Sequence, residues 1–143
     1  MYSTDISWLS NLPLIYLNMG AVNLSRIADS AHVVNTIPSL KVLSLSDCSL
    51  TSANQSLLLL NLTDLVELSL SANHFDHPVA SCWLWNLTSL KHLELAATSL
   101  YGQIPDALGG MTSLQALDFS YNEGNIDVVT ANMTNLCKLE SID

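Results

Sequence analysis

Basic residues are scarce in this sequence of 143 residues, because lysine and arginine together number only 4 against 13 aspartates and glutamates. The formal net charge is −9, and charged residues make up 12% of the chain. An acidic surface repels the phosphate backbone of nucleic acids, which argues against that class of partner. Hydrophobic residues reach 49%, enough for a core and too many for a disordered chain.

Long hydrophobic runs are also missing. The longest plain leucine run covers residues 57–60, whereas a membrane-spanning helix needs about 18 or more apolar residues. The first twelve residues contain no basic cluster, and Asp5 interrupts the early apolar stretch. The sequence therefore predicts neither a membrane span nor a secretory signal peptide within this chain.

The three cysteines, Cys48, Cys82 and Cys137, are too few and too scattered for a cysteine scaffold. An odd number cannot all pair within the chain, and no Cys-x-x-Cys phrase occurs, so a disulfide framework and a zinc site are both improbable. His74 and His77 lie three residues apart but have no third metal ligand in register. We expect them to be solvated loop residues and predict no metal site.

No phrase of the sequence carries the chemistry of an enzyme. The Gly109–Gly110 pair lacks the lysine of a phosphate-binding loop, and we expect it to serve as a turn. Cys137 precedes Lys138, but no histidine is placed to act as its base. The sequence predicts no catalytic residue and no cofactor.

What the sequence does contain is a repeat. Copies begin near residues 14, 40, 65, 90 and 114, and an incomplete sixth begins at 139. In the fourth copy, Leu90, Leu93 and Leu95 are separated by three and then two residues, which matches neither an amphipathic helix nor a plain alternating strand. The pair Leu93 and Leu95 predicts a short strand whose leucines enter one core. Coils of this kind stack, because no single coil can bury its own apolar face.

This pattern resembles the leucine-rich repeat, L-x-x-L-x-L-x-x-N/C-x-L. The resemblance implies an α/β fold in the loose sense: a right-handed solenoid with one parallel sheet on the concave face and an irregular or short-helical convex side, forming one segment over residues 1–143. We expect strands centred on residues 17–19, 43–45, 68–70, 93–95 and 117–119. We expect Trp83 and Trp85 to cover the convex side.

The N/C position of this motif has a specific role in the family, where its side chain binds backbone groups in the turn after each strand. In successive repeats the position holds Val22, Cys48, Asn73, Thr98 and Asn122. Valine cannot donate a hydrogen bond, so the first repeat is expected to be degenerate. Cys48 is interpreted as a buried residue of this series.

One repeat matches a narrower pattern, L-x-G-x-I-P-x-x-L-G-x-L, through Leu100, Gly102, Ile104, Pro105, Leu108 and Gly109. This phrase resembles the plant extracellular subtype of the repeat. It implies a non-enzymatic recognition module from the ectodomain of a receptor-like protein or receptor-like kinase, outside the cell or at the plasma membrane, in defence or developmental signalling. Its partner would be a protein or peptide ligand, with a co-receptor as a further partner.

Several alternatives stay open. A secreted inhibitor of the same repeat type would block an enzyme through its concave face, and a vestigial fragment would have no partner. A receptor kinase would continue into catalytic phrases that this sequence does not contain. The family's capping segment before the first repeat is also missing, so we expect the chain to be a fragment or a truncated gene product.

Five N-x-S/T sequons occur, more than the roughly two or three that composition predicts. Together with the plant-type phrase they favour a glycosylated ectodomain in the secretory pathway. The alternative is a repeated Asn-Leu-Thr phrase without sugar, since two of the sequons share one repeat phase. The candidate glycosylation sites are Asn23, Asn54, Asn61, Asn86 and Asn132.

Strand alternation predicts which side chains point outward onto the concave face. Glu94, Asp118 and Asp143 would form an acidic stripe, beside Glu67 and His92. The plain interpretation is a polar face that keeps the sheet soluble, and the functional alternative is a docking strip for a basic peptide or protein. Small neutral residues in the early repeats give no indication of a pocket. The candidate binding residues are Tyr16, Glu67, His92, Glu94, Asp118 and Asp143.

Overall fold

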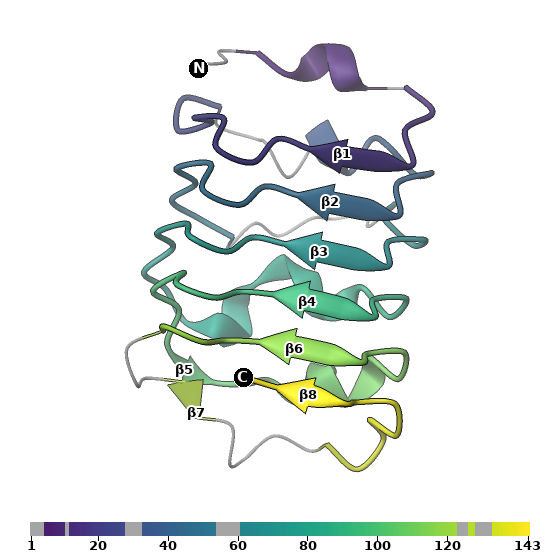
Figure 1. Cartoon of the computed structure of the whole chain (residues 1–143), viewed down its shortest axis with the longest axis vertical. Helices are drawn as coiled ribbons and strands as arrows, with labels where there is room; N and C mark the ends of the chain where they lie inside the picture. The colour runs from purple at the N-terminus through teal and green to yellow at the C-terminus, as the bar shows by residue number, and fades with distance from the viewer. Residues whose placement is uncertain (1–4, 11, 28–32, 54–60, 123–125, 128–132) are drawn as a thin grey trace.

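The computed structural model describes residues 5–10, 12–27, 33–53, 61–122, 126–127 and 133–143. Its main feature is one six-stranded parallel sheet in the order β1-β2-β3-β4-β6-β8, with each repeat adding one strand (Figure 1). The strands are β1 (Tyr16–Asn18), β2 (Val42–Ser44), β3 (Glu67–Ser69), β4 (His92–Glu94), β6 (Ala116–Asp118) and β8 (Ser141–Ile142).

In the sheet, each residue pairs with the residue at the same repeat position in the neighbouring strand. Leu17 pairs with Leu43, and Leu68 pairs with Leu93. The prediction of parallel strands in one sheet is confirmed, although each strand lies one residue earlier than expected. The second leucine of the pair follows its strand and is at most 2% exposed in the second, third and fourth repeats (Leu45, Leu70 and Leu95). In the first repeat this position holds Met19, which is half-buried.

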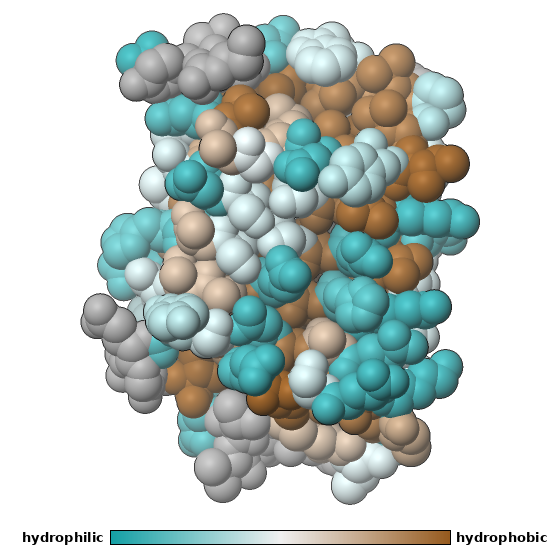
Figure 2. Space-filling view, viewed as in Figure 1, coloured by the Kyte–Doolittle hydropathy of each residue, from teal (hydrophilic) through white to brown (hydrophobic). Residues whose placement is uncertain are grey.

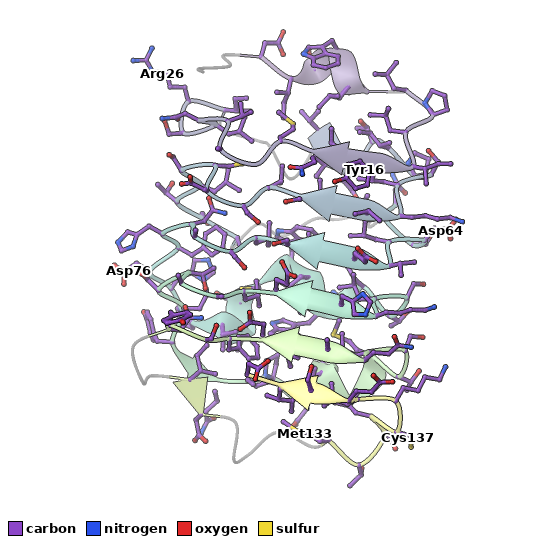
Figure 3. The ribbon with its side chains drawn as sticks, viewed as in Figure 1. Tyr16, Arg26, Asp64, Asp76, Met133 and Cys137 are labelled. Atoms are coloured by element: carbon purple, nitrogen blue, oxygen red, sulfur yellow. The ribbon has the colours of Figure 1, made fainter. Side chains whose placement is uncertain are left out.

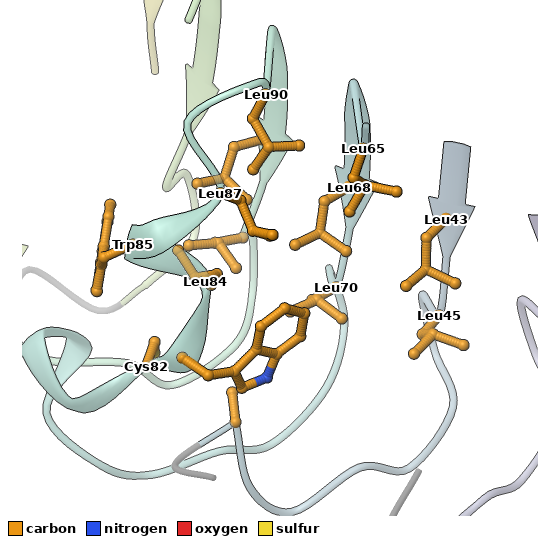
Figure 4. Close-up of a cluster of buried hydrophobic side chains, with 14 of the residues drawn as sticks. Leu43, Leu45, Leu65, Leu68, Leu70, Cys82, Leu84, Trp85, Leu87 and Leu90 are labelled. Atoms are coloured by element: carbon orange, nitrogen blue, oxygen red, sulfur yellow. The ribbon is translucent and has the colours of Figure 1, made fainter. Parts of the chain in front are cut away.

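The core is a stack of these leucines, closed on the far side by the convex segments. Figure 4 shows the side chains of Leu43 and Leu68 entering one buried cluster that also contains Leu84 and Leu87. All four are at most 1% exposed. Burying one such side chain contributes roughly 1.5–3 kcal/mol before entropy is subtracted, so stability accumulates repeat by repeat.

Short 3₁₀ helices form much of the convex side, as the repeat pattern predicted. They are η1 (Ser7–Leu9), η2 (Val79–Ser81), η3 (Trp83–Asn86) and η4 (Asp106–Gly110). The two tryptophans of η3 do not cover the outer surface, because Trp83 is 8% and Trp85 4% exposed. The indole of Trp85 donates to the carbonyl of Val79 at 2.8 Å and lies 6.5 Å from the Phe119 ring. Apolar burial and this hydrogen bond turn the rings inward.

A second, two-stranded parallel sheet was not predicted. It joins β5 (Gly102–Gln103) to β7 (Ile126–Asp127), and an isolated bridge joins Pro78 to Tyr101 beside it. Gly102 has φ of +88°, a conformation that glycine adopts without steric cost. The glycine of the plant-type phrase therefore lets the chain enter this second ladder.

The turn after each strand passes through a left-handed residue immediately before the N/C position. Ala21, Asp47, Ala72, Ala97 and Tyr121 occupy it, with φ between 52° and 60°. The next side chain then binds the turn: Asn122 donates to the carbonyl of Leu95 at 2.7 Å and to its own turn at Phe119. Val22 has no such donor, and its turn keeps the backbone bond from Leu24 N to the carbonyl of Cys48 at 2.8 Å, which has an equivalent in the Asn73 repeat from Phe75 N to the carbonyl of Thr98 at 2.9 Å.

Candidate functional site: the concave sheet face

The strands position the six candidate residues on one face of the sheet. Glu67 pairs with His92 in the register, and Glu94 pairs with Asp118. Asp143 follows β8 and stays aligned, because its N–H donates to the carbonyl of Leu117 at 3.1 Å. Figure 3 shows Tyr16 on the first strand of this face.

A hollow of about 340 Å³ lies on this face over the first four strands. Figure 2 shows hydrophilic and near-neutral residues across the sheet, with hydrophobic residues beside the upper repeats. The small, neutral outward residues had given no indication of this hollow in the sequence. The small serines leave space between larger side chains on either side. The hollow's polar and aromatic lining consists of Tyr16, Asn18, Ser44, Ser46, Glu67, Ser69, His92 and Glu94.

Glu67 and His92 form the one ion pair found on this face among the described residues. Oε1 of Glu67 lies 3.5 Å from Nδ1 of His92, and the side chains are 49% and 44% exposed. An exposed pair contributes only about 0–1 kcal/mol, and only when the histidine is protonated. The pair fixes geometry and local charge more than stability.

The predicted acidic stripe is present, but its members are not equivalent. Glu94 and Asp143 are exposed, whereas Asp118 is half-buried. Oδ1 of Asp118 accepts a hydrogen bond from Ser120 N at 2.8 Å. A second hollow of about 230 Å³ lies here, and His92 and Glu94 line both hollows. The stripe thus has two exposed carboxylates, Glu94 and Asp143, and a third, Asp118, that is hydrogen-bonded to the backbone of the turn after its strand.

A hydroxyl pair at the floor of the larger hollow was missed by sequence reasoning. Ser46 Oγ lies 2.7 Å from Ser69 Oγ and 3.4 Å from Ser44 Oγ. Alternation places these serines outward, but it does not show that hydroxyls of neighbouring repeats meet. Their recurrence at outward positions of successive repeats is the signal that could have indicated a polar row.

The histidines set aside by the sequence analysis have protein partners. His77 Nε2 accepts from Ala53 N at 3.1 Å, and His74 Nδ1 lies 2.9 Å from Ser99 Oγ. Across the described residues, no three His, Cys, Asp or Glu side chains gather as a metal site would require. Burial raises the pKa of the Cys82 thiol to about 12. Cys48 is also buried and its pKa is raised, chiefly by burial.

The candidate glycosylation sites differ in exposure. Asn61 and Asn86 are exposed, while Asn23 is half-buried. Oδ1 of Asn23 accepts from both the N–H and the hydroxyl of Ser25, at 3.0 and 2.6 Å. Asn54 and Asn132 lie outside the described residues. Within the described part of the chain, no helix has the length and apolar character of a membrane span.

Comparison with known proteins agrees with this architecture. No protein-family model matches the chain. Internalin C2 of Listeria monocytogenes matches the fold with a TM-score of 0.66 at 19% identity, over 98% of this chain and 66% of that one. Listeria monocytogenes InlP matches with a TM-score of 0.66 at 26% identity, over 93% and 35%.

Two tomato (Solanum lycopersicum) proteins are related in sequence. Receptor-like protein EIX1 is 34% identical over 123 residues, which cover 82% of this chain and 12% of the relative. Receptor-like protein EIX2 is 33% identical over 119 residues, covering 77% and 11%. This chain is thus a leucine-rich repeat solenoid that is homologous to these plant receptor-like proteins over about a tenth of their length.

Proposed function

We propose that this chain is a non-enzymatic recognition module of a plant receptor-like protein, and that its concave face binds a basic protein or peptide segment. The observation that carries the proposal is the hollow of about 340 Å³ over β1 to β4, lined by two carboxylates, an exposed tyrosine and serine hydroxyls. Homology to two proteins named receptor-like supports the recognition role.

The chemistry of the hollow suits an extended segment with a cationic side chain. Glu67 and Glu94 supply negative charge on neighbouring strands, about 4.8 Å apart in the sheet. Tyr16 is 60% exposed and offers a rigid aromatic surface. The serine hydroxyls can donate to or accept from a peptide backbone.

Charge on this face contributes mainly to the rate of encounter. An exposed ion pair adds up to about 1 kcal/mol, so carboxylates alone give weak binding. A net charge of −9 steers a basic partner from a distance, and the effect fades beyond about 8–10 Å in physiological salt. Tight binding therefore needs the aromatic and hydroxyl contacts as well.

The proposal places the full protein outside the cell or at its membrane, in defence or developmental signalling, with glycans on the exposed sequons. The plant-type repeat phrase and the receptor-like relatives support this location. Exposed Asn61 and Asn86 can carry sugars without loss of core contacts. Binding experiments are needed to identify the ligand and any co-receptor.

The test is a screen of a twelve-residue peptide library of varied net charge against the whole chain. We expect the bound peptides to be rich in lysine and arginine, and their association rates to fall as salt is raised. The double variant Glu67→Gln/Glu94→Gln should lower those rates, because it removes two charges from the hollow.

The matched control is Asp64→Asn/Asp106→Asn, which removes the same charge from two exposed positions outside the hollow. Figure 3 shows Asp64 at the edge of the solenoid. If both double variants slow association equally, net charge alone explains binding and the concave site is refuted. Bound peptides without basic residues would also contradict it.

A further inference from the structure

A hollow on the flank of the solenoid, separate from the concave face, has features that the fold does not explain. It measures about 340 Å³ and lies beside the turns that follow the strands. We call it the flank hollow. Its lining residues are His74, Asp76, Ala97, Ser99, Leu100, Tyr101 and Tyr121. Figure 3 shows Asp76 on this flank, away from the strands of the sheet.

Tyr121 is the most unusual member. It occupies the left-handed turn position, with φ of 58°, where three other repeats carry alanine. A bulky residue in this conformation is strained, and Tyr121 is 84% exposed, so little burial offsets the cost. Tyr101, at 40% exposure, brings a second phenol ring to the same hollow. Exposed tyrosines that the core does not need are typical anchors of binding sites.

The charge of the flank hollow is negative. The carboxylate of Asp76 is exposed, and none of the chain's four basic residues lines the hollow. A second hollow adjoins it, shares His74 and Ala97, and adds the exposed Asp47, again without a lysine or arginine. The flank thus offers carboxylates and aromatic faces with no cation of its own.

We propose that the flank hollow docks an arginine side chain from a protein partner. A guanidinium group is planar and weakly hydrated, so it stacks on a phenol ring while it forms a two-pronged ion pair with a carboxylate. Tyr101, Tyr121 and Asp76 supply those groups in one hollow. Lysine, a compact and strongly hydrated charge, fits the aromatic faces less well. This site is independent of the concave site proposed above.

The flank hollow can be tested without harm to the fold. Tyr121→Ala installs the residue that other repeats carry at this turn. Asp76 has φ of 48°, and Asp76→Asn removes the charge while keeping a residue that tolerates left-handed backbone. Asp64→Asn is the matched control because it removes an exposed charge that lies outside both the flank hollow and the concave hollow.

The experiment is a titration of the ¹⁵N-labelled whole chain with acetyl-Gly-Arg-Gly-amide in 150 mM salt, followed by amide chemical shifts. We expect saturable shifts centred on residues 74–76, 97–101 and 121. Tyr121→Ala and Asp76→Asn should each weaken binding about threefold to fivefold, and Asp64→Asn should not. The lysine peptide should bind more weakly than the arginine peptide, and the citrulline peptide should not bind.

Three results would overturn the proposal. Equal binding of the arginine and lysine peptides would show general attraction to an acidic protein. Shifts centred on the concave face would relocate the basic ligand to that site and leave the function proposed above intact. Stronger shifts of the flank residues by the neutral sugar cellohexaose would make the flank hollow a carbohydrate site.

Discussion

Asn73 binds the backbone of Cys48 in the preceding repeat, where its Oδ1 accepts from Cys48 N at 3.1 Å. The same oxygen accepts from Leu50 N at 3.0 Å, and Nδ2 donates to the carbonyls of Leu45 and Leu70 at 2.8 and 2.7 Å. One buried amide therefore joins two coils. Asn122 does the same for the two following repeats, so the amide clamps alternate along the solenoid.

The first prediction is that Asn73→Ala lowers the free energy of unfolding by about 2–4 kcal/mol, because several buried backbone groups lose their partner. Asn73→Thr should lose less, since Thr98 fills the same position and donates to the carbonyl of Leu95 at 2.8 Å. Urea denaturation followed by circular dichroism measures both. Equal free energies of unfolding for Asn73→Ala and the unaltered protein would show that the Asn73 hydrogen bonds do not stabilise the fold.

The second prediction concerns the two sides of the sheet. Leu93 is 1% exposed in the core, whereas Ser69 is half-buried on the concave face. Leu93→Ala should lower the free energy of unfolding by about 2–5 kcal/mol, because it leaves a cavity between coils. Ser69→Ala loses its hydrogen bond to Ser46 and should cost at most about 1 kcal/mol. Similar losses in chemical denaturation would contradict the assignment of inner and outer positions.

The spacing of the leucines predicted the sheet through its resemblance to the leucine-rich repeat, because coils that stack in equal phase bring their strands side by side. The outward columns followed from alternation alone. Alternation says nothing of how far a side chain reaches, so neither the hollow beside Tyr16 nor the bond from Ser120 N to Asp118 could be foreseen. The inward rings of Trp83 and Trp85 likewise depend on space left by neighbouring coils.

The third prediction uses the left-handed turns. Ala72 has φ of 56°, which costs a residue with a Cβ about 1–2 kcal/mol. Ala72→Gly removes that cost from the folded state. Glycine also raises the conformational entropy of the unfolded chain, which offsets part of the gain, so we expect a net stabilisation of about 0.5–1 kcal/mol. Ala116→Gly, in strand β6, should instead destabilise. The expected sign is opposite for the two variants, and a destabilising Ala72→Gly would exclude strain at this turn.

The fourth prediction concerns the thiols, whose reactive form is the thiolate. Burial raises the pKa of Cys82 to about 12 and also raises the pKa of Cys48. At pH 8, the thiolate fraction of Cys82 is therefore about 1000-fold lower than that of a thiol with the ordinary value of 9.0. A colorimetric thiol reagent should label only the exposed Cys137 rapidly in the folded protein, and all three in urea. Rapid labelling of a Cys137→Ser variant would show that the core opens readily.

The last prediction concerns the sequons, and it applies to the chain secreted from plant or insect cells behind an added leader. Asn61 and Asn86 are exposed, so a glycan on either extends into solvent without loss of core contacts. A glycan on Asn23 would attach to Nδ2 and leave intact the bonds that Oδ1 accepts from Ser25, so the half-burial of Asn23 is what lowers access to its Nδ2. We therefore expect high occupancy at Asn61 and Asn86 and low occupancy at Asn23, measured by mass spectrometry before and after enzymatic deglycosylation.

Single variants assign each glycan in this experiment. Asn61→Gln and Asn86→Gln should each remove one glycan mass, whereas Asn135→Gln, at an exposed asparagine outside any sequon, should remove none. Asn86 ends η3 and is not among the residues that line the concave hollow. A sugar there leaves the concave hollow open to a ligand. Full occupancy of Asn23 with Asn61 and Asn86 empty would show that exposure in the fold does not govern which sequons carry sugar.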